Sequence, residues 1–185
     1  MSTKVITGKV RFSYVNIFEP RASEDGGEPK YGVTLLIPKS DTTTMGKIKA
    51  AMAEAADTFR KKNGTASLPA NPSNPIHDGD GLKPSGDPYG PECAGCWVIA
   101  TSSKQRPVIV DAFRNEITDP NEVYSGCFGR AAVNFYGYNN RKKGIGAGLQ
   151  SIQKLTDGEP LGGSRGSADD FDDGYTDADM DDLLA

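Results

Sequence analysis

The chain has 185 residues, of which 36% are hydrophobic and 25% charged, with 22 glycines and 12 prolines. This length allows one domain of ordinary size plus an appendage, and the glycine and proline content favours short strands and turns over helical bundles. No apolar run approaches the length of a membrane span and the N-terminal residues lack a secretory signal, so we expect a cytoplasmic protein without a membrane partner. Three cysteines in such a chain argue against a disulfide framework.

The charges are segregated along the chain. Residues 164–185 hold eight aspartates and a single base, Arg165, whereas residues 1–163 hold 20 basic and 17 acidic residues. A mildly basic body joined to a strongly acidic tail suggests nucleic acid as a partner. We expect one folded domain over residues 1–160 and a flexible, disordered acidic tail over residues 161–185, because the tail has too little apolar content to order itself.

The N-terminal part of the sequence predicts a β-hairpin. Residues 4–18 alternate as a strand does, with Val10, Phe12 and Tyr14 on one face and basic or polar residues on the other. Residues 19–29 are rich in glycine, proline and acids, which is typical of a loop, and residues 30–37 resume the strand pattern.

The rest of the body predicts one helix and several more strands. After residues 38–41 end the preceding strand, a proline-free stretch to Lys62 has apolar residues at helical spacing and stops at Asn63-Gly64. A long irregular connection follows, from residue 65 to residue 91. Further strands are expected at 96–102, 107–110, 129–138 and 145–155. Five or six strands with one helix inserted early indicate a mainly β fold, a small Greek-key β-barrel.

Some apolar residues are expected to form the core of this barrel. Trp97 lies in an apolar strand, so burial is the more common outcome, although its ring is also a candidate stacking surface. The other expected core residues are Phe12, Val33, Leu35, Val108 and Val133.

The strongest candidate for binding chemistry is the strand at residues 129–138. Its alternation puts Val133 and Phe135 on one face of the strand. The other face combines a cation with aromatic rings and consists of Arg130, Asn134, Tyr136 and Tyr138. Binding of single strands without sequence preference needs cations that follow the phosphates and aromatic faces on which unpaired bases stack. The sequence therefore predicts a single-stranded DNA-binding surface. The alternative is that these are ordinary solvated charges and that the tyrosines cap the core.

Other residues extend the predicted surface. A basic turn with Arg141, Lys142 and Lys143 directly follows the tyrosines and suits backbone phosphates. Tyr31 is a further candidate stacking residue, although it lies in an apolar strand, where burial in the core is the more common outcome. The remaining candidate cations are Lys9, Arg11, Lys104, Arg106 and Arg114.

Catalysis and metal binding have little support in the sequence. Cys93 and Cys96 have the spacing of half a zinc site, but no other residues complete a common zinc module, so no metal and no cofactor are expected. Asp78 and Asp80 could donate carboxylates to a metal-dependent nuclease, which is the alternative enzymatic function. We interpret them as part of a turn and expect that the protein is not an enzyme. A structural or adaptor protein without a nucleic-acid ligand is a third possibility.

The acidic tail mixes aspartates with isolated apolar residues. Aspartates mimic phosphates and can compete for a basic groove, whereas apolar residues at the very end suit a short recognition anchor. A tail that serves only solubility is the alternative. The predicted partner-binding residues are Asp177, Asp179, Asp181, Asp182, Leu183 and Leu184.

Several segments, taken in order, resemble a family of single-stranded DNA-binding proteins of tailed bacteriophages. The matching segments are 31–39 before the helix, 77–81 in the long loop, 123–127 before the basic strand, and 144–149 continuing through 157–159. This resemblance implies an OB-fold-like barrel, sequence-independent binding of single-stranded DNA, and a role in phage DNA replication, recombination and repair. The tail also resembles the acidic C-termini of bacterial and T7-type single-stranded DNA-binding proteins. This second resemblance implies that the tail binds replication or recombination proteins, although it ends in Leu-Leu-Ala here and not in an aromatic residue.

Overall fold

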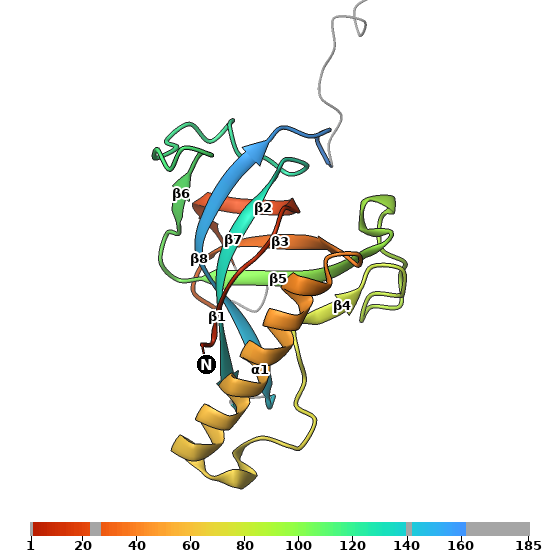
Figure 1. The fold of residues 1–185 in the computed structure, drawn as a ribbon, viewed down its shortest axis with the longest axis vertical. Coiled ribbons are helices and arrows are strands. Elements are labelled where there is room, and N and C mark those ends of the chain that lie inside the picture. Colours follow the sequence, from red (N-terminus) through yellow and green to blue (C-terminus); the bar gives the residue numbers. More distant parts are fainter. Residues whose placement is uncertain (1, 23–26, 140–141, 162–185) are drawn as a thin grey trace, which may run out of the picture.

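The computed structural model describes residues 2–22, 27–139 and 142–161, which form eight strands, one long helix and two single 3-10 turns (Figure 1). In chain order the strands and the helix are β1 Lys4–Ile6, β2 Val10–Arg21, β3 Lys30–Pro38, α1 Thr42–Asn63, β4 Ile76–Asp78, β5 Cys96–Ser103, β6 Val108–Val110, β7 Phe128–Tyr138 and β8 Gly144–Thr156. The predicted mainly β fold with one inserted helix is confirmed. Within the described ranges, no helix is both long and apolar enough to cross a membrane.

Five strands close into a barrel. β2 pairs with β3, β3 with β5, β8 with β7 and β7 with β2, all antiparallel. A parallel contact between Ser102 of β5 and Gly148 of β8 closes the ring. A five-stranded, partly open Greek-key barrel is the OB-fold-like architecture. The short strands β1, β6 and β4 extend it by pairing with β7, β8 and β5.

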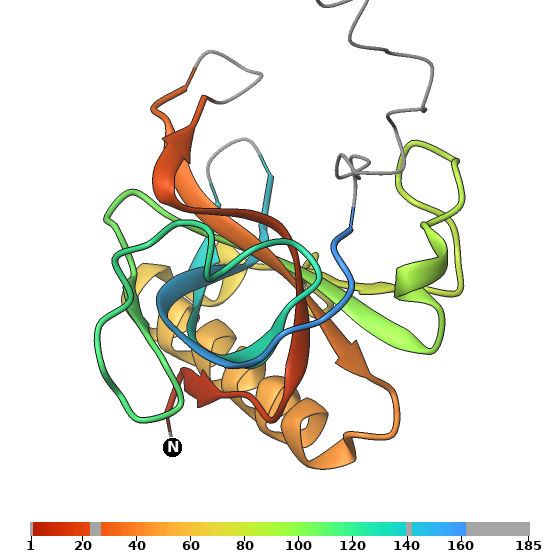
Figure 2. The same ribbon diagram turned by 90° about the horizontal axis from the view of Figure 1, so that it is seen from above.

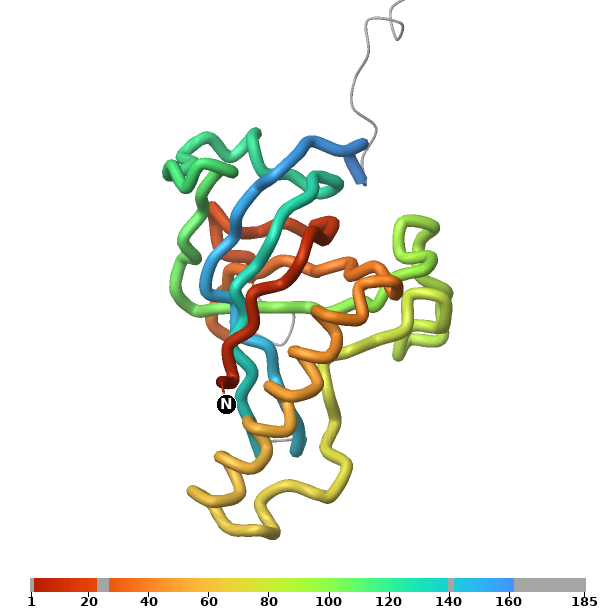
Figure 3. The backbone as a smooth tube through the Cα atoms, in the orientation of Figure 1, coloured from red at the N-terminus to blue at the C-terminus, as the bar shows by residue number. Residues whose placement is uncertain are grey.

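The helix α1 covers one face of the β7–β8 hairpin, which extends well beyond the barrel (Figures 1 and 3). The helix begins after Asp41, whose carboxylate accepts a hydrogen bond from the Thr44 backbone N–H at 3.1 Å. Near the other end, the Phe59 ring lies so close to Gly137 of β7 that a Cβ there would be 2.6 Å from it. The predicted helix is therefore confirmed, and a glycine is needed for it to pack against the hairpin.

The first predicted strand is divided in two. Residues 4–6 form β1 and pair with β7, whereas β2 starts at Val10 and forms the predicted hairpin with β3. Between the two strands the chain changes direction around Thr7, whose backbone N–H donates to the Ala131 carbonyl at 3.0 Å. The Gly8 N–H donates to the Thr44 hydroxyl at 2.9 Å, which fixes this corner against the helix.

The inward alternation of β2 ends after Phe12. Val10 and Phe12 are buried as expected, and Ser13 is buried as well, but Tyr14 is 60% exposed. The pairing register with β3 is irregular between Ser13 and Asn16, and Tyr14 has a left-handed backbone with φ 48°. The expectation that Tyr14 shares the core face is therefore wrong, because the irregularity turns its side chain outward.

Most of the expected core residues are buried. Phe12, Val33, Leu35 and Val133 lie in the main hydrophobic cluster. Val108 is 61% exposed, so its predicted burial is wrong: β6 has only three residues, and Ile109 is the one that points inward. Trp97 is partly buried at the edge of the core, and the Lys39 ammonium lies 4.8 Å from the centre of its ring.

Candidate nucleic-acid interface

The outward face of the β7–β8 hairpin presents two tyrosines. Phe135 points toward α1 and the core, so its neighbours Tyr136 and Tyr138 project from the opposite face. Tyr136 is 44% exposed, and its ring centre lies 6.5 Å from that of Tyr138 at an interplanar angle of 56°. Partial burial raises the pKa of the Tyr136 hydroxyl above its ordinary value, with a smaller contribution from Tyr138, so the ring is neutral at physiological pH.

Glycines of β8 form the seat of the Tyr136 ring. Gly146 is the residue opposite Tyr136, and a Cβ on Gly146 would lie 2.6 Å from the Cζ atom of that tyrosine. Gly148 lies under the other side of the ring, where a Cβ would be 3.6 Å from it. Because these positions carry no side chain, the ring can lie against the strand and keep its other side exposed.

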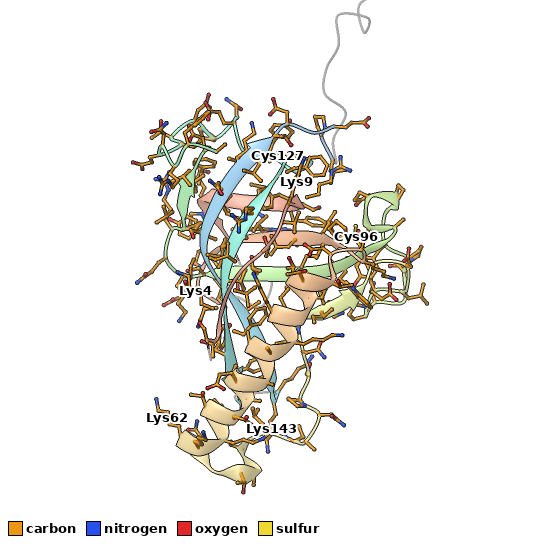
Figure 4. All side chains as sticks on the ribbon, viewed as in Figure 1. Lys4, Lys9, Lys62, Cys96, Cys127 and Lys143 are labelled. Atoms are coloured by element: carbon orange, nitrogen blue, oxygen red, sulfur yellow. The ribbon has the colours of Figure 1, made fainter. Side chains whose placement is uncertain are left out.

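The hairpin tip carries cations. Lys142 and Lys143 are exposed just before β8, and Figure 4 shows Lys143 at the same end of the molecule as Lys62, in the last turn of α1. Arg141 was predicted to belong to this turn, but it lies outside the described residues. The structure therefore places the tyrosines and two of the predicted cations on one hairpin.

The tyrosine face continues across the barrel as a row of small residues. Asn134 of β7 lies opposite Gly148, Gly148 opposite Ser102 of β5, Ser102 opposite Gly32 of β3, and Gly32 opposite Asn16 of β2. This row leads from the β7–β8 hairpin to the β2–β3 hairpin, which projects from the barrel in Figure 2. The surface between the two hairpins is the one that OB-fold proteins use for oligonucleotides.

Two further predicted residues lie near the β2–β3 hairpin. Tyr31 is half-buried opposite Ser103 of β5. Lys104, the residue after Ser103, is exposed, and its ammonium lies 3.6 Å from the carboxylate of Glu28. This surface ion pair is weak, so Lys104 remains available to a phosphate.

Arg106 and Arg114 lie on the side of the barrel that carries β6. The Arg106 guanidinium is 5.6 Å from the centre of the Phe18 ring, and both arginines line one shallow cavity beside β6. Arg114 has a left-handed backbone with φ 68°, in a turn closed by hydrogen bonds to Asp111. Neither of them belongs to the row of small residues between the hairpins.

Lys9 and Arg11 are grouped around Phe128. Their charged groups lie 5.2 and 5.5 Å from the centre of that ring. Arg11 also donates to the carbonyls of Gly126 at 3.1 Å and Glu159 at 2.7 Å, so it holds the segments before β7 and after β8 together. Figure 4 shows Lys9 at the opposite end of the molecule from Lys143, so these two predicted cations do not share a site.

Arg130 and Asn134 hold the N-terminal segment against β7. The Arg130 Nε donates to the Thr7 carbonyl at 2.9 Å, and the Asn134 side-chain oxygen accepts a hydrogen bond from the Thr3 hydroxyl at 2.7 Å. The predicted face of β7 is therefore divided along the strand. Its first half fixes β1, and its second half exposes the tyrosines.

The sequence interpretation missed an apolar pocket beside the row of small residues. It lies between the outer face of β2, β3 and β5 and the loop that connects β4 to β5, and its volume is ≈ 340 Å³. Tyr14 and Tyr89 contribute aromatic rings, and Leu36, Val98 and Ala100 contribute aliphatic surface. Tyr14 was not predicted to line a pocket because regular alternation of β2 would place it on the core face. Tyr89 was not predicted because it lies in the proline-rich connection, where the sequence has no periodic pattern.

The two carboxylates considered for a nuclease bind a lysine. The Lys39 Nζ lies 2.6 Å from Asp78 Oδ1 and 2.7 Å from Asp80 Oδ2. These hydrogen bonds hold the pKa of each carboxyl below its ordinary value and raise the pKa of Lys39. Asp80 also accepts a hydrogen bond from the Gly95 N–H at 2.9 Å, so the group fastens the connection between β4 and β5 to the end of β3.

The cysteines are embedded in the fold. Cys93 belongs to a small cluster with Leu36 and Val98, and Cys127 is fully buried. Burial raises the pKa of each of these two thiols and that of the partly buried Cys96, which favours the protonated form of all three. No group of three or more potential metal-ligating side chains occurs among the residues that the structure describes.

Comparison with known proteins identifies relatives over nearly the whole chain. The family model described as "Enterobacter phage Enc34, ssDNA-binding protein" matches residues 3–184. The protein p50 of Acyrthosiphon pisum secondary endosymbiont phage 1 is 32% identical over 189 residues, covering 98% of this chain and 99% of that protein.

Solved structures of phage proteins have a similar fold. The single-stranded DNA-binding protein of bacteriophage Enc34, in complex with ssDNA, is 37% identical with a TM-score of 0.70, covering 86% of this chain and 90% of that one. A second structure of the single-stranded DNA-binding protein from bacteriophage Enc34 has a TM-score of 0.67 at 34% identity, covering 91% of this chain and 89% of that one. The single-stranded DNA-binding protein gp2.5 of bacteriophage T7 covers 92% of this chain and 98% of its own with a TM-score of 0.59, but at 14% identity it supports the fold alone.

Proposed function

Because the chain belongs to the family of phage single-stranded DNA-binding proteins named after that of Enterobacter phage Enc34, we propose that it coats single-stranded DNA without sequence preference. The observation that carries this proposal is the half-exposed Tyr136 ring on its glycine seat, close to the cations of the hairpin tip. The coating is stoichiometric and not catalytic. It serves phage DNA replication, recombination and repair in the cytoplasm of the host cell.

In the proposed mechanism, aromatic rings bind the bases and cations bind the phosphates. Unpaired bases stack on Tyr136 and Tyr138, while Lys142 and Lys143 on one side and Lys104 on the other bind phosphates. The row of small residues between the hairpins lets the strand approach the sheet. Stacking and phosphate contacts do not distinguish base identity, which accounts for binding without sequence preference.

Six other predicted residues have supporting roles in this proposal. Arg11, Arg130 and Asn134 are positioning residues, because their side chains already bind groups of the protein. Lys9, Arg106 and Arg114 lie on other parts of the surface and contribute long-range attraction for a polyanion.

A titration of fluorescent oligo-dT at two salt concentrations tests the function. We expect saturable binding that weakens by orders of magnitude between about 50 and about 200 mM salt, because each phosphate contact releases counterions. Labelled DNA should stay intact when magnesium is added, since the Asp78 and Asp80 carboxylates are occupied by Lys39. Absence of binding at the lower salt concentration contradicts the proposal, and turnover of DNA by substoichiometric protein contradicts the coating mechanism.

The stacking residues are tested by Tyr136→Ala and Tyr138→Ala. Each stacked base contributes about 1–3 kcal/mol, so each variant should bind roughly 5- to 150-fold more weakly. The exposed ring of Phe113, on the turn beside β6, provides a matched control, and Phe113→Ala should bind as the wild type does. Unchanged affinity of both tyrosine variants would remove the proposed stacking face.

The acidic tail is proposed to regulate this binding and to recruit partners. Its predicted partner-binding residues lie outside the described residues; they are Asp177, Asp179, Asp181, Asp182, Leu183 and Leu184. Eight aspartates compete with phosphates for the basic surface. Deleting residues 164–185 should therefore tighten binding of oligo-dT, most clearly at low salt. The same deletion should abolish retention of replication or recombination proteins on the immobilised chain.

A further inference from the structure

The apolar pocket under the connection between β4 and β5 has the features of a second binding site. Its floor is the outer face of the barrel, where Leu36 and Val98 are buried in a small cluster of their own. Its walls include the rings of Tyr14 and Tyr89. Burial raises the pKa of the Tyr89 hydroxyl, so this ring too is neutral. A flat apolar ring with polar edges is the type of ligand that such walls accept.

The wall of the pocket is fixed before any ligand arrives. Lys39 binds Asp78 and Asp80, and the Gly79 N–H donates to the Cys96 carbonyl at 2.9 Å. A Cβ on Gly79 would lie only 2.1 Å from the Cys93 carbonyl oxygen, so the two ends of the connection are in close contact. Figures 1 and 2 show this connection standing out beside the barrel. A preformed wall lowers the conformational cost of binding.

Tyr14, which lines the pocket, departs from two ordinary preferences. Its backbone is left-handed, with φ 48°, a conformation that residues with bulky side chains rarely adopt. The residue is also 60% exposed to water, although the alternation of a regular strand would bury its large side chain. Backbone outliers of this kind concentrate at ligand-binding sites, where the binding gain offsets the cost.

Polar groups surround the opening. Lys83 holds its ammonium 5.8 Å from the centre of the Tyr89 ring. The other polar residues that line the pocket include Ser13, Thr34, His77 and the acidic Glu92. The cation provides a contact for a phosphate, and the side chains offer hydrogen bonds to a base edge.

The pocket adjoins the path proposed for the DNA strand. Thr34 lies opposite Ala100, two residues along β3 from Gly32 and Ser102, which belong to the row of small residues. A DNA strand that follows this row from Tyr136 toward the β2–β3 hairpin therefore passes the opening of the pocket. We propose that the pocket takes one unstacked nucleobase of the bound strand, between Tyr14 and Tyr89, with Lys83 on the adjacent phosphate. This inference rests on the proposed function.

The test combines two substitutions of Tyr14 in the full chain. Tyr14→Asn removes the ring and keeps a residue that tolerates the left-handed backbone, so the domain should unfold at the same or a higher urea concentration. Its affinity for oligo-dT should nevertheless fall roughly 5- to 150-fold, the range for one stacked base. Tyr14→Phe keeps the ring and should bind as the wild type does.

Photo-cross-linking of the wild type provides a measurement that does not depend on any variant. An oligonucleotide containing 5-iodouracil reacts with aromatic side chains on which the base is stacked, and mass spectrometry locates the attachment. We expect cross-links to Tyr14 or Tyr89 in addition to Tyr136.

The failure of this inference is distinguishable from the failure of the proposed function. If the wild type binds oligo-dT and Tyr136→Ala weakens binding, the function stands. If Tyr14→Asn and Tyr89→Ala then bind as tightly as the wild type and no cross-link forms at either residue, the pocket is not a base site. Loss of binding in Tyr14→Phe as well as in Tyr14→Asn also overturns the inference, because a stacked base needs only the ring. If the wild type binds no oligonucleotide at all, both proposals fall together.

Discussion

Replacing Gly146 by alanine should disturb DNA binding without disturbing the fold. A Cβ at this position would lie 2.6 Å from Cζ and 2.7 Å from the hydroxyl oxygen of Tyr136. Such a distance is too short for a real contact, so one of the two groups must move. The far end of the tyrosine moves at little cost, because this ring is already 44% exposed and can swing outward.

The expected loss of affinity follows from the displaced ring. If the Tyr136 ring moves away from Gly146 and Gly148, the protein loses the stacking contribution of up to one base, about 1–3 kcal/mol of binding free energy. Every cation of the interface remains in place. Gly146→Ala should therefore bind oligo-dT up to roughly 150-fold more weakly. The salt dependence of binding should be unchanged, because the same phosphates are neutralised.

Gly46 in α1 provides the matched substitution. A Cβ on Gly46 would meet nothing within 4 Å, and the residue is exposed on the helix. Gly46→Ala should stabilise the domain by about 1 kcal/mol, through helix propensity, and raise its Tm by about 2–4 °C. Its affinity for DNA should match that of the wild type. Wild-type affinity of Gly146→Ala, measured by the same fluorescence anisotropy titration, would refute the role assigned to the glycine seat.

Two further predictions concern charges. Replacing Lys142 and Lys143 together by glutamine should lower the slope of log Kd against log salt by about 0.7 for each phosphate that these lysines neutralise. The free energy of unfolding should not change. An unaltered slope would exclude the hairpin tip from the interface. Lys39 lowers the pKa of Asp78 and Asp80 from the ordinary value of 3.8, so its ion pairs with the two carboxylates stabilise the folded state. This contribution to the free energy of unfolding is present above about pH 4 and is lost as the pH falls through the lowered pKa values. In urea unfolding between about pH 3 and pH 6, Lys39→Met should therefore lose less stability on acidification than the wild type; parallel curves would contradict the role of the clamp.

Local patterns in the sequence were enough to predict most of the regular elements. The alternation in residues 30–37 and 129–138 and the helical spacing before Lys62 correspond to β3, β7 and α1. Each of these elements is long enough for several repeats of its period to establish which face is buried. The prediction for Val108 was wrong because β6 is only three residues long, too short for its alternation to identify the inward residue.

The division of the cations into separate groups could not be predicted. Arg11 and Arg130 bind carbonyl groups 115 and 123 residues away along the chain, at Gly126 and Thr7. A sequence pattern identifies an arginine on an exposed face, but not the distant backbone oxygen that it binds. The tyrosines differ in this respect, because their exposure depends on the local alternation of β7 and on the glycines paired with them.

The β7–β8 hairpin shows how one pair of strands serves both folding and binding. On the inner face, Gly137 makes room for Phe59, which lets α1 pack against the hairpin. On the outer face, Gly146 makes room for Tyr136, which keeps an aromatic ring flat and half exposed. Added side chains therefore have opposite consequences on the two faces. On the inner face they force the helix away and reduce stability, whereas on the outer face they move only a ring that the fold does not need. Mutations that separate stability from DNA affinity should lie on the outer face, because only there does the displaced group have solvent to move into.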